Sequence, residues 1–124
     1  MRGDKKTLTI GTNCELGDSV HIVAHRNVII GNNVLVASKV FISDTNHGNY
    51  KGSNISNHNS PPNMRELYYD ETVVGENVWI GENAVILAGS KIGNGCVIGA
   101  NTVVSKAIPP NSIVVGHNEV IRQY

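Results

Sequence analysis

Residues 74–109 read VGENVW IGENAV ILAGSK IGNGCV IGANTV VSKAIP, six consecutive hexapeptides that each open with Val or Ile. The same slot is aliphatic in the earlier part of the chain, so that the full series is Ile10, Leu16, Ile22, Ile30, Val36, Ile42, Val74, Ile80, Ile86, Ile92, Ile98 and Val104. A short fixed period of this kind is the signature of a solenoid, in which each repeat buries its apolar residues against its neighbours.

Glycine groups the hexads into threes. It follows the first aliphatic residue of every triplet (Gly11, Gly31, Gly75, Gly93) and never the third. The true period is therefore eighteen residues, and we expect each triplet to form one triangular coil of three short strands. In this interpretation the aliphatic residues point inward, and the glycines occupy corners whose backbone angles other residues resist.

The composition limits the possible functions. A chain of 124 residues with ten basic and ten acidic residues predicts one domain, residues 1–124, without electrostatic attraction to nucleic acid. No apolar run is long enough to span a membrane, and the start MRGDKKTLTIG lacks the apolar stretch of a signal peptide. Cys14 and Cys96 form no C-x-x-C pair and fall on inward-facing slots, which indicates core packing and a cytoplasmic location.

The repeat is interrupted by a two-residue insertion between Ile22 and Ile30 and by a long polar excursion, residues 48–71. Long irregular segments in compact domains are usually functional or disordered. Three of the four tyrosines, Tyr50, Tyr68 and Tyr69, lie in the excursion, which favours a loop that docks against something over a tolerated disordered insertion. Residues 117–124 are expected to form a C-terminal tail.

His47 is the last residue of the hexad before the excursion. On an eighteen-residue stack it shares a column with Asn27, Lys91 and Pro109, so we expect it on rigid scaffold at the mouth of the loop. A histidine there can take a proton from a hydroxyl and return it, although an isolated histidine near a loop is more often structural.

Several segments resemble the hexapeptide-repeat acetyltransferases, the family that includes galactoside, maltose and polysaccharide O-acetyltransferases. The matching segments are IIGNNVLVAS (residues 29–38), a histidine followed by a long loop, VVGENVWIG through IVVG (residues 73–116) and a terminal VIR (residues 120–122). The resemblance implies an all-β, left-handed parallel β-helix of four to five coils. It further implies a homotrimer that transfers acetyl from acetyl-CoA to a sugar or polysaccharide-precursor hydroxyl.

The resemblance also implies roles for individual residues. His47 would be the general base of a direct transfer, and Asp44 is one candidate for the group that orients it. Expected acceptor-binding residues are His25, Asn27, Asn46 and Tyr50; galactoside-type enzymes tend to have an acidic residue at the position of His25, so a different acceptor is expected.

The acetyl-CoA groove is expected between coils of adjacent subunits, lined by Gly81, Ala88 and Ala100. Trp79 would flank its active-site end, and Ser105 and Lys106 its nucleotide end. Arg122 is a further candidate, although the tail GHNEVIR lacks the proline usual in the family.

Two alternatives remain open. The γ-class carbonic anhydrases share the fold and bind zinc through three histidines, for which His21, His25 and His47 would suffice, but their His-x4-His spacing is absent and no metal site is predicted. The chain could also be a non-catalytic assembly module, or could use acyl carrier protein in place of acetyl-CoA.

Overall fold

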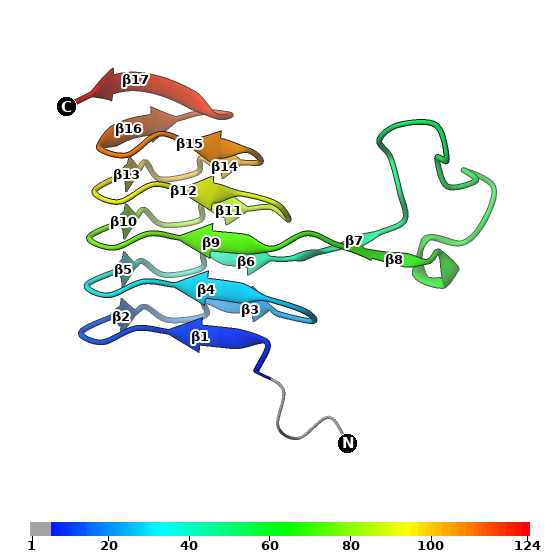
Figure 1. Ribbon diagram of the computed structural model, residues 1–124, viewed down its shortest axis with the longest axis horizontal. Coiled ribbons are helices and arrows are strands. Elements are labelled where there is room, and N and C mark those ends of the chain that lie inside the picture. Colours follow the sequence, from blue (N-terminus) through cyan, green and yellow to red (C-terminus); the bar gives the residue numbers. More distant parts are fainter. Residues whose placement is uncertain (1–5) are drawn as a thin grey trace.

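The computed structural model describes residues 6–124, which form a left-handed parallel β-helix of about five coils (Figure 1). Sheet A contains β1 (Leu8–Ile10), β4 (Val28–Ile30), β9 (Thr72–Val74), β12 (Lys91–Ile92) and β15 (Ala107–Ile108). Sheet B contains β2 (Glu15–Leu16), β5 (Leu35–Val36), β10 (Trp79–Ile80), β13 (Val97–Ile98), β16 (Ser112–Val115) and β17 (Glu119–Gln123). Sheet C contains β3 (His21–Val23), β6 (Phe41–Ser43), β11 (Val85–Ile86) and β14 (Val103–Val104). No helix in this part of the chain is long and apolar enough to cross a membrane.

The hexad slots stack in register, as the eighteen-residue period predicts. In sheet C, Ile86 pairs with Ile42 on one side and with Val104 on the other. From the second coil upward these aliphatic residues are at most 3% exposed. Full burial of one such side chain contributes about 1.5–3 kcal/mol, so the repeated column is the source of the core.

The first coil differs from this prediction, because Ile10 and Leu16 are 38% and 44% exposed. Each coil needs a neighbour on both sides to bury its aliphatic residues, and in the described residues the first coil has one only on the side of β4 and β5. At the other end, the predicted tail is a strand: β17 pairs antiparallel with β16.

The prediction that the glycines after the aliphatic residues adopt unusual backbone angles at the corners was wrong. The left-handed backbone angles occur two residues further on, at the fourth hexad position, where the chain has mostly asparagine (Asn13, Asn33, Asn77, Asn83, Asn101, Asn111) and sometimes glycine (Gly89, Gly95). Gly81 is required for a different reason. A Cβ on it would lie 2.6 Å from the backbone nitrogen of Ala100 in the next coil, closer than packed atoms approach.

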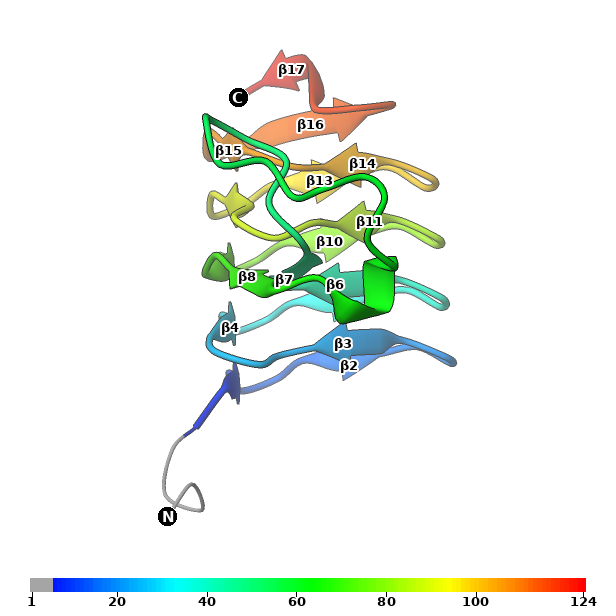
Figure 2. The same ribbon diagram turned by 90° about the vertical axis from the view of Figure 1, so that its right-hand side faces the viewer.

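We name the corners by the sheets they join. Corner BC carries residues 81–84 and 99–102, and corner CA carries residues 24–27, 87–90 and 105–106. The excursion leaves the prism at corner CA between β6 and β9 and forms an arm, residues 45–71 (Figures 1 and 2). The arm contains β7 (Thr45–His47), a 3-10 turn at Pro62–Met64 and β8 (Leu67–Tyr69), which pairs antiparallel with β7.

Candidate functional site at the root of the arm

Asp44 is the residue at which the chain leaves the prism, and its side chain is fully buried. One carboxylate oxygen accepts the backbone N–H of His25 at 3.1 Å and the hydroxyl of Thr45 at 2.7 Å. The other accepts the backbone N–H groups of Arg26 and Asn27, both at 2.8 Å. Burial raises the pKa of Asp44, but the hydrogen bonds from Thr45, Arg26, Asn27 and His25 outweigh it, so the pKa is lowered.

The main chain of Asp44 holds the second strand of the arm. Its carbonyl accepts the backbone N–H of Asp70 at 2.9 Å, and the carbonyl of Asp70 accepts the N–H of Gly89 at 3.2 Å. The root of the arm is thus tied to the corner below it by the Asp44 side chain, and to the corner above it through Asp70. This attachment fixes where β7 begins.

His47 lies on β7, opposite Leu67 of β8, and its side chain is exposed. The predicted column was wrong: Lys91 stacks on Val73 and Ala107 in sheet A, and His47 is outside the stack. The prediction that Asp44 could orient His47 was also wrong, because its carboxylate is bound to corner CA and to Thr45. His47 is therefore positioned by the hairpin that Asp44 anchors.

The two faces of the hairpin carry different groups. Successive side chains of a strand point to opposite faces, so Thr45 and His47 share one face and Asn46 points to the other. The Thr45 hydroxyl lies 2.8 Å from Nδ1 of His25, and the His25 ring meets the Tyr69 ring edge to face at 5.8 Å. His25 therefore contacts the face of the arm that carries His47.

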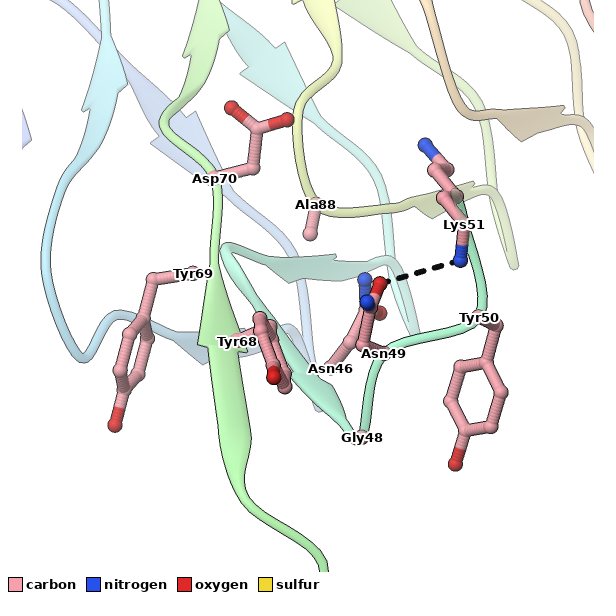
Figure 3. Close-up of a pocket in the computed structure, with 9 residues that line it drawn as sticks. All are labelled: Asn46, Gly48, Asn49, Tyr50, Lys51, Tyr68, Tyr69, Asp70 and Ala88. Atoms are coloured by element: carbon pink, nitrogen blue, oxygen red, sulfur yellow. Dashed lines mark hydrogen bonds between the residues drawn. The ribbon is translucent and has the colours of Figure 1, made fainter. Parts of the chain in front are cut away.

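A shallow pocket of about 180 Å³ lies on the opposite face, between the arm and corner CA (Figure 3). It is lined by Asn46, Gly48, Asn49, Tyr50, Lys51, Tyr68, Tyr69, Asp70 and Ala88. This pocket brings together three predicted site residues, Asn46, Tyr50 and Ala88, but its described lining does not include His47. The Tyr50 hydroxyl donates to the carbonyl of His47 and accepts from Arg65 at 2.8 Å.

A second groove, of about 240 Å³, runs beside corner BC. It is lined by Ala37, Trp79, Gly81, Glu82, Val97, Ile98, Gly99 and Ala100. Three predicted cofactor residues, Trp79, Gly81 and Ala100, therefore lie together. Trp79 is 53% exposed and offers an uncovered apolar face.

The other predicted cofactor residues lie elsewhere. Ser105 and Lys106 occupy corner CA, above Ala88, and thus a different corner from Gly81 and Ala100. Ser105 also contacts His117, which was not among the predicted site residues. The Ser105 hydroxyl lies 3.2 Å from Nε2 of His117. Arg122 lies on β17, where its guanidinium stacks on Tyr124 at 4.7 Å.

Asn27, the remaining predicted acceptor residue, donates from its side-chain amide to Glu71 at the end of the arm. Within residues 6–124 no three His, Cys, Asp or Glu side chains cluster as a metal site. Cys96 is buried, with its thiol 3.2 Å from the carbonyl of Pro109, and Cys14 is half-buried.

The chain is similar in sequence to known O-acetyltransferases. Residues 71–106 match the family described as bacterial transferase hexapeptide (six repeats). Over 114 residues the chain is 46% identical to WbbJ of Escherichia coli (strain K12), named for O-acetyl transfer in lipopolysaccharide biosynthesis, with 90% of this chain and 58% of WbbJ covered. Over 107 residues it is 38% identical to the galactoside O-acetyltransferase of the same organism, with 86% and 49% covered. The chain thus spans only about half the length of these relatives.

Solved structures agree with the fold. A galactoside acetyltransferase in complex with coenzyme A superposes with a TM-score of 0.72 at 32% identity, covering 93% of this chain and 64% of that one. A hexapeptide-repeat acetyltransferase from Vibrio cholerae, complexed with acetyl coenzyme A, gives a TM-score of 0.80 at 26% identity, covering 95% and 61%.

Proposed function

Because the chain belongs to the hexapeptide-repeat acetyltransferase family, we propose that it transfers acetyl from acetyl-CoA to a hydroxyl of a sugar or polysaccharide precursor. The observation that carries the proposal is the exposed His47 on an anchored hairpin beside the prism. The relatives named for O-acetyl transfer align with 86–90% of this chain. The scaffold therefore matches the family, and the arm supplies a group suited to proton transfer.

His47 acts as the general base. One imidazole nitrogen removes the proton of the acceptor hydroxyl while the hydroxyl oxygen attacks the thioester carbonyl carbon. When the tetrahedral intermediate collapses, the C–S bond breaks, the ester is formed and the imidazolium returns the proton to the departing CoA thiolate.

The division of the predicted cofactor residues between two corners supports a homotrimer. Gly81 and Ala100 lie at corner BC, whereas Ala88 and Lys106 lie at corner CA, with sheet C between them. One elongated acetyl-CoA contacts both sets if corner BC of one subunit faces corner CA of the next. Trp79 and Leu35, exposed on adjacent strands of sheet B, provide apolar surface for that contact.

The experiment compares His47→Ala with His58→Ala, since both histidines are exposed residues of the arm. Thiol release from acetyl-CoA is measured with a panel of nucleotide sugars and glycans as acceptors. We expect His47→Ala to lose about 10²–10⁴-fold in turnover, as general bases do, and His58→Ala to retain wild-type turnover. Sedimentation of the wild type and both variants tests whether the substitutions change the oligomeric state. Undiminished turnover in His47→Ala would exclude it as the base.

The acceptor panel, together with elemental analysis for zinc, also distinguishes a zinc protein and a non-catalytic module from an acetyltransferase. A wild-type protein that releases no thiol with any acceptor, yet binds stoichiometric zinc by elemental analysis, would be a metalloprotein. One that does neither would be a non-catalytic module.

A further inference from the structure

The buried carboxylate of Asp44 determines more than the position of the arm. Through the Thr45 hydroxyl it is connected to the ring of His25, an exposed residue of corner CA. We propose that Asp44 and Thr45 are positioning residues that hold neutral His25 as the Nδ1–H tautomer, so that Nε2 accepts a hydrogen bond from the acceptor substrate. The substrate contact rests on the proposed acetyl transfer; the tautomer does not.

The tautomer follows from counting hydrogens. The Thr45 hydroxyl has one hydrogen and lies 2.7 Å from the Asp44 carboxylate and 2.8 Å from Nδ1 of His25. An ionised carboxylate can only accept, so the hydroxyl hydrogen points to Asp44. The bond to His25 then requires a hydrogen on Nδ1. In a neutral imidazole this leaves Nε2 without a hydrogen and with a free lone pair.

The carboxylate is well suited to this role. Its lowered pKa keeps it ionised near neutral pH, and three backbone N–H groups fix its orientation. One of these N–H groups belongs to His25 itself, so the same carboxylate oxygen holds both the backbone of His25 and, through Thr45, its ring. Neither the backbone nor the ring of His25 can turn without breaking a bond to the Asp44–Thr45 pair.

His25 is exposed and lies on the same side of the hairpin as His47. Thr45 and His47 share a face of β7, so the ring that contacts Thr45 is on the side of the hairpin that carries the proposed base. Tyr69 supports the His25 ring, and the Arg26 guanidinium lies 4.5 Å from the centre of the Tyr69 ring. A sugar bound on this face would donate one hydroxyl hydrogen to Nε2.

The chemical consequence concerns the charge of the acceptor. A neutral imidazole accepts a hydroxyl hydrogen without adding negative charge, and Arg26 beside it is cationic. A carboxylate at the position of His25 would repel an anionic acceptor. With His25 there, this face suits a sugar that carries an anionic group, such as a nucleotide sugar.

The first test is spectroscopic and needs no substrate. In protein labelled with ¹⁵N-histidine, long-range ¹H–¹⁵N correlation at mildly alkaline pH distinguishes the two neutral tautomers, and His25→Gln assigns the signal. We expect His25 to be the Nδ1–H form in the wild type and in Thr45→Ser. In Thr45→Val, which replaces the hydroxyl with a methyl group of similar size, we expect the mixture of tautomers seen for a free imidazole. A wild-type Nε2–H form, or no change in Thr45→Val, overturns the proposal.

The second test measures acetyl transfer with the best nucleotide sugar of the panel. For Thr45→Val we expect kcat/KM for the acceptor to fall about tenfold, the cost of one mispaired hydrogen bond, while KM for acetyl-CoA stays unchanged. Thr45→Ser should restore the wild-type value. Full acceptor kcat/KM in Thr45→Val overturns the substrate contact. If His25 shows the expected tautomer but no acceptor supports thiol release, the proposed function fails, and the substrate role of His25 fails with it.

Discussion

Replacing Gly93 with alanine tests whether the glycines after the aliphatic slots serve to let the coils approach. An added Cβ would lie 2.6 Å from the backbone nitrogen and 2.7 Å from Cα of Pro110 in the coil above. These are main-chain atoms of a proline, and real Cβ contacts essentially never fall below 3.0 Å, so the coils must separate by at least about 0.4 Å locally (3.0 minus 2.6).

The magnitude combines two opposing effects. Overpacking of this kind costs about 1–3 kcal/mol, and the reduced freedom of the unfolded chain returns about 0.4–1 kcal/mol. We therefore expect a net loss of about 1–2 kcal/mol, which lowers Tm by roughly 4–8 °C in a domain of this size. Gly99→Ala is the matched control, because its Cβ would meet its nearest neighbours at 3.3 Å. Its Tm should stay within about 2 °C of the wild type.

The assay is thermal unfolding followed by circular dichroism, with all proteins at one protomer concentration because assembly would make Tm concentration-dependent. Equal Tm values for the two variants, or a Gly93→Ala protein as stable as the wild type, would refute the close-approach explanation. In that case the glycines would have to be explained by backbone conformation after all.

Three further predictions use the same unfolding measurement. Ile86→Ala, at a fully buried site, should cost about 2–5 kcal/mol, whereas Ile10→Ala, at a partly exposed site, should cost clearly less. Asn83 has a left-handed backbone (φ 62°), so Asn83→Ala should destabilise by about 1 kcal/mol while Asn83→Gly stays near the wild type. The pKa of Asp44 is lowered on folding, so its carboxylate stabilises the protein above the unfolded pKa, about 3.9, and this contribution is lost as pH falls through the folded pKa. Between neutral pH and strongly acidic pH, the Tm of the wild type should therefore fall more than that of Asp44→Asn.

The fold could be predicted because the sequence repeats with two short periods, one of six residues and one of eighteen. The six-residue spacing identifies the inward slot and the eighteen-residue spacing identifies the coil, and the register of Ile86 with Ile42 and Val104 confirms both. The handedness came from the family resemblance, since spacing alone does not distinguish a left-handed from a right-handed coil. The period also could not show that Ile10 and Leu16 are partly exposed, because burial depends on which coils have two neighbours.

The site was harder to predict because its contacts join segments that the repeat does not relate. Because the hexad spacing was extended to His47, this residue was predicted to lie on the prism. The chain instead leaves the prism at Asp44, whose carboxylate binds backbone N–H groups of a corner 17–19 residues earlier in the sequence. A buried aspartate before a threonine gives no periodic signal. The resemblance grouped Gly81, Ala88 and Ala100 in one groove, but within one subunit Ala88 lines the pocket beside the arm, whereas Gly81 and Ala100 lie with Trp79 at corner BC.

The insertion of the arm leaves the ladder around it undisturbed. β6 pairs with β11, and β4 with β9, in the same register that an uninterrupted chain would use, although 27 residues intervene between Asp44 and Thr72. The corner at Asp44 therefore accommodates a long insertion without any change in the register of the strands on either side, and the contacts of Thr45 and Asp70 with the two corners are the part of the arm that belongs to the prism.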